Sequence, residues 1–143
     1  MRSQLRNVKQ GRRLTKTVYL HMLEKEFVPP QESLELKELG FDEPCLAWFS
    51  ETKELQIAPE TYKKWTRNPC DNSSIVKVFN PDCFTAPTFS QAFRWFREKY
   101  DLFIAIVHYE NGYSINDLRR FETYEEAELA CLRKLIEVAK ARG

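Results

Sequence analysis

The chain has 143 residues, of which 43% are apolar, 30% charged and 13% aromatic. This composition is typical of a folded globular domain and excludes a wholly disordered, collagen-like or low-complexity chain. The net charge is +1, but residues 1–16 hold six basic and no acidic residues, which leaves 16 basic against 21 acidic residues in 17–143. We therefore expect a flexible basic extension over residues 1–21 and a single, mildly acidic domain over residues 22–143.

The basic extension suggests one possible activity. Basic residues without neighbouring acids can contact the phosphates of a nucleic acid. Met22 begins a stretch of different composition, which leaves open whether residues 1–21 belong to the native chain. The candidate phosphate contacts in the extension are Arg2, Arg6, Lys9, Arg12, Arg13 and Lys16.

The cysteine spacing and the hydropathy pattern indicate the cellular compartment and whether a metal site is expected. The thiols stand at positions 45, 70, 83 and 131, and no two are close enough for the local ligand pairs of a structural zinc site. The apolar run 18–23 is too short for a signal peptide or a membrane span. We therefore expect a cytoplasmic protein with reduced thiols, no metal site, no cofactor and no membrane partner.

The first half of the domain begins with an extended entry over residues 26–28, followed by a helix over 31–39. Gly40 stands where a left-handed residue would end that helix. Residues 45–50 and 55–58 are predicted to form a hairpin. The strand 45–50 is apolar on both faces, so either both faces are covered or one of them is a binding surface.

The middle of the chain gives weaker signals. We expect a helical turn over 60–66, a loop over 69–74, a strand over 75–79 and a turn over 80–82. In the stretch 62–67, Tyr62 and Trp65 could stack on bases while Lys63, Lys64 and Arg67 meet phosphates. The alternative is that the two aromatic side chains pack inward and the lysines lie in water.

The second half carries the clearest periodicity. Capping boxes at 88–91 and 123–126 predict helices over 89–100 and 124–141, each with a broad apolar face. Between them we expect a strand over 102–109, a type I′ turn at Asn111-Gly112 and a return strand over 113–121. The chain is thus predicted to be α+β: an antiparallel sheet built from hairpins, two main amphipathic helices that bury Phe93, Phe96, Leu132 and Leu135, and a helix–hairpin–helix C-terminal half.

Three stretches, 35–49, 86–100 and 123–136, carry a resemblance to a known group of sequences. In this order they resemble small uncharacterised bacterial proteins carried by prophages and mobile elements, over about residues 22–143. The resemblance implies an accessory, non-catalytic protein and assigns no catalytic or binding residue.

The lack of known catalytic motifs also favours a non-catalytic protein. The chain contains no nucleophile elbow, P-loop or dinucleotide fingerprint, and only two histidines. We therefore expect no enzyme and no catalytic residues, but a protein that associates with an unknown protein partner or with itself. Weak nucleic-acid binding through the basic extension is the alternative.

The aromatic excess supplies the candidates for an interface. The chain has 19 aromatic residues, and large aromatic side chains at the edge of a buried face are typical interface anchors. Trp48, Trp65 and Trp95 are the candidates. The alternative for Trp95, which lies off the main stripe of its helix, is a second packing contact within the same domain.

Overall fold

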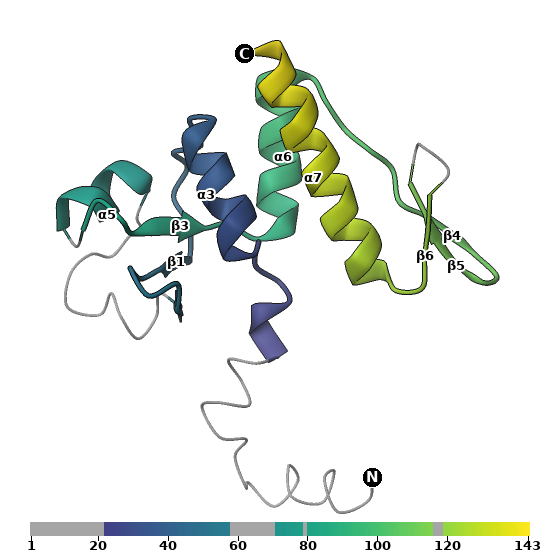
Figure 1. Cartoon of the computed structure of the whole chain (residues 1–143), viewed down its shortest axis with the longest axis horizontal. Helices are drawn as coiled ribbons and strands as arrows, with labels where there is room; N and C mark the ends of the chain where they lie inside the picture. The colour runs from purple at the N-terminus through teal and green to yellow at the C-terminus, as the bar shows by residue number, and fades with distance from the viewer. Residues whose placement is uncertain (1–21, 58–70, 79, 116–118) are drawn as a thin grey trace, which may run out of the picture.

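The computed structural model describes residues 22–57, 71–78, 80–115 and 119–143. Figure 1 shows helices α3, α6 and α7 side by side in the middle, with one small sheet on either side. The predicted α+β class is confirmed. The elements are α3 (Pro30–Glu38), β1 (Ala47–Phe49), β2 (Leu55–Ile57), α5 (Asn72–Val78), β3 (Phe84–Ala86), α6 (Phe89–Tyr100), β4 (Val107–Tyr109), β5 (Gly112–Ser114), β6 (Arg120–Phe121) and α7 (Tyr124–Arg142).

The strands form two separate antiparallel sheets, with the orders β2-β1-β3 and β4-β5-β6. The expected single sheet is therefore wrong. Each sheet is covered by its own helix: α3 packs on β3, and α7 packs on β5 and β6. Strand β3, which sequence periodicity did not predict, pairs Phe84 with Phe49 and Ala86 with Ala47. A strand of three residues is too short to show a period of two, so only its pairing reveals it.

Helix α3 ends as its sequence predicts. Gly40 has a φ of 93°, the left-handed conformation that closes a helix at low steric cost. The amide of Gly40 donates to the carbonyl of Lys37 at 3.0 Å, and that of Phe41 donates to Leu36 at 2.9 Å. These two bonds make the Schellman arrangement, and Phe41 enters the core as its hydrophobic contact.

The predicted strand over 75–79 is wrong, because residues 72–78 form helix α5. Local caps outweigh the β propensity of the Ile-Val pair. The Asp71 carboxylate accepts from the amide of Ser74 at 2.8 Å, and the Asp42 carboxylate accepts from both the amide and the hydroxyl of Ser73. Ile75 is fully buried by this placement. Asp71 is adjacent to the helix in sequence, but Asp42 is 31 positions away. The sequence pattern therefore could not include the contact with Asp42 that favours the helix over a strand.

A buried amide connects α5 to the rest of the fold. Asn72 donates to the carbonyl of Phe41 at 2.7 Å and accepts from the amide of Thr85 at 2.8 Å. Both ends of the Asn72 side chain are satisfied, and the bonds join the end of α3, the start of α5 and strand β3. A buried polar group with this geometry specifies one arrangement of three elements.

The two main helices begin at their predicted caps. The Thr88 hydroxyl accepts from the amide of Gln91 at 3.2 Å, and the Thr123 hydroxyl accepts from the amide of Glu126 at 3.2 Å. The Gln91 side chain also bonds outside the box: its amide nitrogen donates to the carbonyl of Pro44 at 2.8 Å. That bond uses the side chain to hold the 41–46 connection against α6.

The main core lies where α3, α6 and α7 meet. Leu36, Phe96 and Leu132 contribute one fully buried side chain from each helix. Leu135 is also buried and Phe93 is half-buried, so the predicted apolar faces of the two long helices do form the core. Among the described residues, no helix combines the length and apolar character needed to cross a bilayer.

The C-terminal hairpin differs from its prediction by one residue. Tyr109 pairs with Gly112, so the turn residues are Glu110 and Asn111. Gly112 has a φ of 139°, while Asn111 is not among the residues with positive φ. The expected type I′ turn at Asn111-Gly112 is therefore wrong. The return strand is also interrupted: β5 and β6 are separate and pair with each other.

Candidate interaction surface

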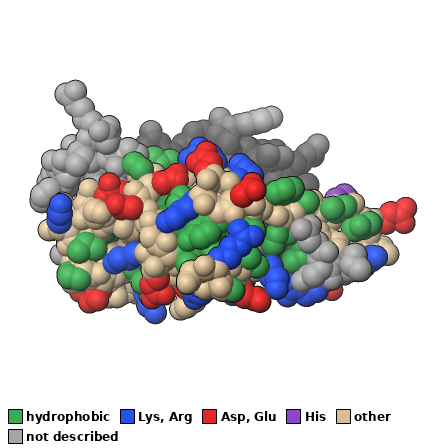
Figure 2. Space-filling view, turned by 90° about the horizontal axis from the view of Figure 1, so that it is seen from above, with side chains coloured by type: hydrophobic (Ala, Val, Ile, Leu, Met, Phe, Trp, Pro, Cys, Tyr) green, Lys and Arg blue, Asp and Glu red, His purple; other side chains and the backbone are tan. Residues whose placement is uncertain are grey.

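The segment 102–109 exposes an apolar face. It leaves α6 through Asp101, whose φ of 54° turns the chain. Half-buried and exposed residues then alternate from Leu102 to Val107, and His108 and Tyr109 are both exposed. Phe103, Ala105, Val107 and Tyr109 are exposed and follow one face of the segment; we call these four residues the outer stripe. Exposed fractions are 70% for Phe103, 45% for Val107 and 44% for Tyr109. Figure 2 shows hydrophobic side chains gathered at the end of the molecule that carries this hairpin.

The opposite face of the same segment fixes it to the domain. Leu102 and Ile104 pack against the main core, and Ile104 and Ile106 pack against the smaller cluster formed by Ala127 and Cys131 of α7. The segment is thus apolar on both faces, but only one face is covered. Its buried side holds the outer stripe on a supported backbone.

The segment also presents an open backbone edge. β4 is an edge strand, with β5 as its neighbour in the sheet. Within the described part of the chain, no backbone amide from Phe103 to Ile106 donates a hydrogen bond to another residue. Exposed edges of this kind are templates for pairing with another strand, and proteins commonly protect them with charges. Here no charged residue lies between Asp101 and Glu110.

A cation borders the outer stripe at one end. The guanidinium of Arg120, on β6, lies 5.2 Å from the centroid of the Tyr109 ring. Arg120 stands opposite Ser114, which in turn stands opposite Val107, so this cation lies on the same face of the sheet as the stripe. The stripe is therefore uncharged along its length and positive beside Tyr109.

The tryptophans predicted as interface anchors lie elsewhere. Trp95 is 6% exposed and packs edge to face on Phe41 at 5.4 Å and on Tyr100 at 5.4 Å, with the Lys99 ammonium 4.9 Å from its ring. Trp48 is 7% exposed within the β2-β1-β3 sheet. Intramolecular packing, the alternative left open for Trp95, accounts for these contacts. Trp65 lies outside the described residues.

The basic candidates all fall outside the described residues. They are Arg2, Arg6, Lys9, Arg12, Arg13 and Lys16 in the extension, and Lys63, Lys64 and Arg67 in the stretch 62–67. Nucleic-acid binding through them stays a prediction.

The described thiols are poor nucleophiles. Burial raises the pKa of the Cys45 thiol to about 12, and burial also raises the pKa of Cys83. Cys131 is fully buried on α7. His108 lies on β4, in the sheet opposite the one that Cys45 precedes, so these two groups do not meet (Figure 1). In the described ranges, no three His, Cys, Asp or Glu side chains gather as a metal site would require.

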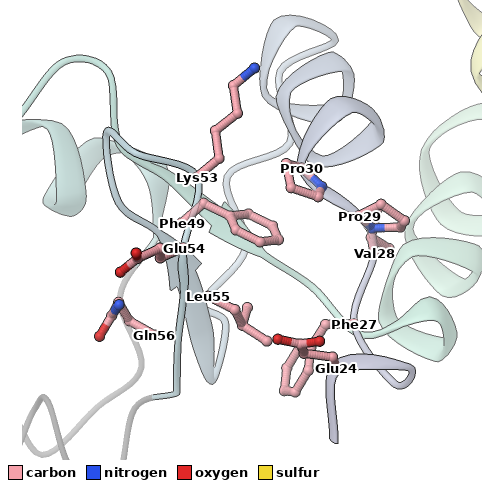
Figure 3. A pocket seen from close by; sticks show the side chains of 10 residues that line it. All are labelled: Glu24, Phe27, Val28, Pro29, Pro30, Phe49, Lys53, Glu54, Leu55 and Gln56. Carbon is pink, nitrogen blue, oxygen red and sulfur yellow. The ribbon is translucent and has the colours of Figure 1, made fainter. Parts of the chain in front are cut away.

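An open cleft of about 650 Å³ lies between the 24–30 segment and the β1–β2 hairpin. Figure 3 shows Phe49 and Leu55 of the hairpin pointing towards Phe27 and Pro30, while Lys53 points away from the cleft. The walls combine these apolar side chains with Glu24, Glu54 and Gln56, and no histidine or cysteine is among the described lining residues. Both walls continue directly into residues outside the described ranges, so the cleft carries no assignment.

The sequence contains the outer stripe but does not distinguish it from a buried strand. Residues 102–109 read Leu-Phe-Ile-Ala-Ile-Val-His-Tyr, apolar on both faces, as does the strand at 45–50. Most of the strand at 45–50 is buried on both sides, whereas the outer face of 102–109 stays exposed.

Comparisons with protein-family models, with curated proteins and with solved structures found no match for this chain.

Proposed function

We propose that this protein is a non-catalytic interaction module that acts by protein association through the outer stripe. The observation that carries the proposal is the coincidence of exposed, uncharged side chains with an open backbone edge on one segment. Such an edge can accept a further strand, which adds main-chain hydrogen bonds to side-chain burial. Burying a fully exposed Phe or Val side chain contributes about 1.5–3 kcal/mol, so Phe103, which is the most exposed of the three large members, is expected to contribute most to the contact.

The rest of the described surface supports the same reading. Of the described thiols, Cys45, Cys83 and Cys131 are buried, and burial raises the pKa of Cys45 and Cys83. Among the residues that the structure describes, the cleft beside the β1–β2 hairpin is lined by no cysteine, serine, threonine or histidine. The resemblance to accessory proteins of prophages and mobile elements points to the same class of function. A partner that recognises shape and apolar area, rather than a small substrate, is what the outer stripe fits.

Site-specific photocrosslinking tests this function. Benzoylphenylalanine in place of Phe103, irradiated in the cell that makes the protein, is expected to give a discrete protein adduct. The matched control is the same group in place of Leu46, which is also apolar and 55% exposed but lies beside the other sheet. Adducts of equal yield at both positions, or none at position 103, would remove the outer stripe as the functional surface.

A further inference from the structure

The proposed surface has the features of a self-complementary one. We infer that the outer stripe pairs with the same segment of a second copy of this chain, antiparallel, across a two-fold axis at Ile106. This inference rests on the proposed function and specifies the partner. An isologous contact brings the same patch of both copies together, so one segment must complement itself in size, polarity and charge.

The alternation of exposure restricts the register. In antiparallel pairing, residues directly opposite each other lie on the same face of the sheet. The outer stripe must therefore face the outer stripe of the second copy. A two-fold axis at Ile106 puts Phe103 opposite Tyr109 of the second copy, and Ala105 opposite Val107. Each large aromatic ring then meets another, and the small side chain meets the branched one, which are favourable cross-strand pairs.

The backbone groups agree with this register. Tyr109 and Gly112 flank a two-residue turn, so their main-chain groups point at each other across the hairpin. Successive residues of an extended chain alternate in direction, which leaves the groups of His108 pointing to the open edge, together with those of Ile106 and Ile104. With the axis at Ile106, these three residues face His108, Ile106 and Ile104 of the second copy in reverse order.

Formal charges lie only at the two ends of the pairing. Asp101 lies two residues before Phe103, and the Arg120 guanidinium lies over Tyr109. The Arg120 guanidinium belongs to β6, on the far side of β4 from the second copy, so it contacts Tyr109 of its own chain and not a residue of the copy. Glu110 faces Leu102 of the second copy, beyond the stripe. Between Asp101 and Glu110 the one basic side chain is His108, which stands opposite Ile104 of the second copy, so no like charges face each other along the stripe.

Molar mass measured against concentration tests the association. A strand-to-strand contact is smaller than a standard interface, so we expect the full chain to shift from monomer to dimer between about 10 μM and about 1 mM. The double variant Phe103→Glu/Tyr109→Glu is expected to weaken the dimer at least about tenfold, because like charges then face each other. Leu46→Glu, an equally polar change at an exposed site, is the control and is expected to leave the dimer unchanged.

A charge-pair variant tests the register. In Phe103→Lys/Tyr109→Glu, the inferred pairing sets each new cation against a new anion of the second copy. This variant is expected to dimerise at least about tenfold more tightly than the double Glu variant. If the two variants are equally monomeric while both keep the wild-type circular dichroism spectrum, the axis is not at Ile106 and the inference is wrong.

The outcomes separate this inference from the proposed function. A wild-type chain that stays monomeric to about 1 mM excludes the second copy. In that case a Phe103 crosslink to a different protein still supports association through the outer stripe. A wild-type dimer that is unaffected by Phe103→Glu/Tyr109→Glu overturns the inference by placing the interface elsewhere. A Phe103 adduct with the mass of two chains is the result expected if both proposals hold.

Discussion

The Nε of Arg133 donates to the carboxylate of Glu32 at 2.9 Å, across 101 positions of sequence. Glu32 lies on α3 with a side chain only 4% exposed, whereas the Arg133 side chain on α7 is 64% exposed. The pair therefore joins a buried anion to a cation that is largely solvated. It fixes α3 against α7 at the point where the two helices cover the main core.

Removing the cation should cost more than an ordinary surface ion pair. Arg133→Met keeps most of the aliphatic stem but leaves Glu32 buried without its partner. We expect the free energy of unfolding to fall by about 1–2 kcal/mol, less than for a fully buried pair because Arg133 is exposed. Urea denaturation at neutral pH measures this. Lys134→Met is the control: it removes the exposed pair with Glu137 and should cost less than about 0.5 kcal/mol.

Gly112 should be the least replaceable glycine of the described chain. A Cβ added there would lie 2.3 Å from the carbonyl oxygen of Phe121, and the φ of 139° is strained for any other residue. Gly112→Ala is expected to destabilise the hairpin by about 2–3 kcal/mol. Gly40→Ala meets only the flexible end of Lys99 and should cost about 1 kcal/mol. Equal losses for the two variants in thermal denaturation would contradict this ranking.

Glu128 should make stability depend on pH. Its partial burial and the nearby carboxylates of Glu26 and Glu125 raise its pKa from 4.5 to about 7. The folded chain thus binds this proton more tightly than the unfolded chain, so the free energy of unfolding falls as pH rises from about 4.5 to about 7. Stability from this group is complete below that window and absent above it.

Glu128→Gln should remove that dependence. Since the amide stays neutral, the variant is expected to be about 1 kcal/mol more stable than the wild type at pH 8 and nearly equal at pH 4. Chemical denaturation at the two pH values checks the sign. Glu137→Gln changes an exposed carboxylate of the same helix and should show no such difference between the two pH values.

The alternative function predicts its own behaviour. If residues 1–16 bind nucleic acid, a chain lacking residues 1–21 is expected to lose its retardation of a DNA probe in a gel. Six phosphate contacts imply that the affinity of the full chain falls about a thousandfold between about 50 and about 200 mM salt. Retardation that is unchanged by the deletion, or insensitive to salt, would exclude this function.

Local signals were sufficient wherever a segment carried its own caps and a long period. Thr88 and Thr123 begin the two main helices, and the Gly40 terminus of α3 forms as predicted. Hydroxyl caps, a positive-φ glycine and a 3.6-residue apolar stripe act within about four residues, so the sequence alone determined the three central helices and the α+β class.

Tertiary contacts decided the rest. The Ile75 segment is a helix because Asp42 caps it from 31 positions away and because Asn72 binds Phe41 and Thr85. Tertiary neighbours also decide the exposure of two aromatic side chains. Trp95 is buried because Phe41 and Tyr100 pack against it, whereas Phe103 stays exposed. Periodicity shows that a face is apolar, but only the assembled neighbours determine whether that face is covered, because burial is a property of packing between distant segments.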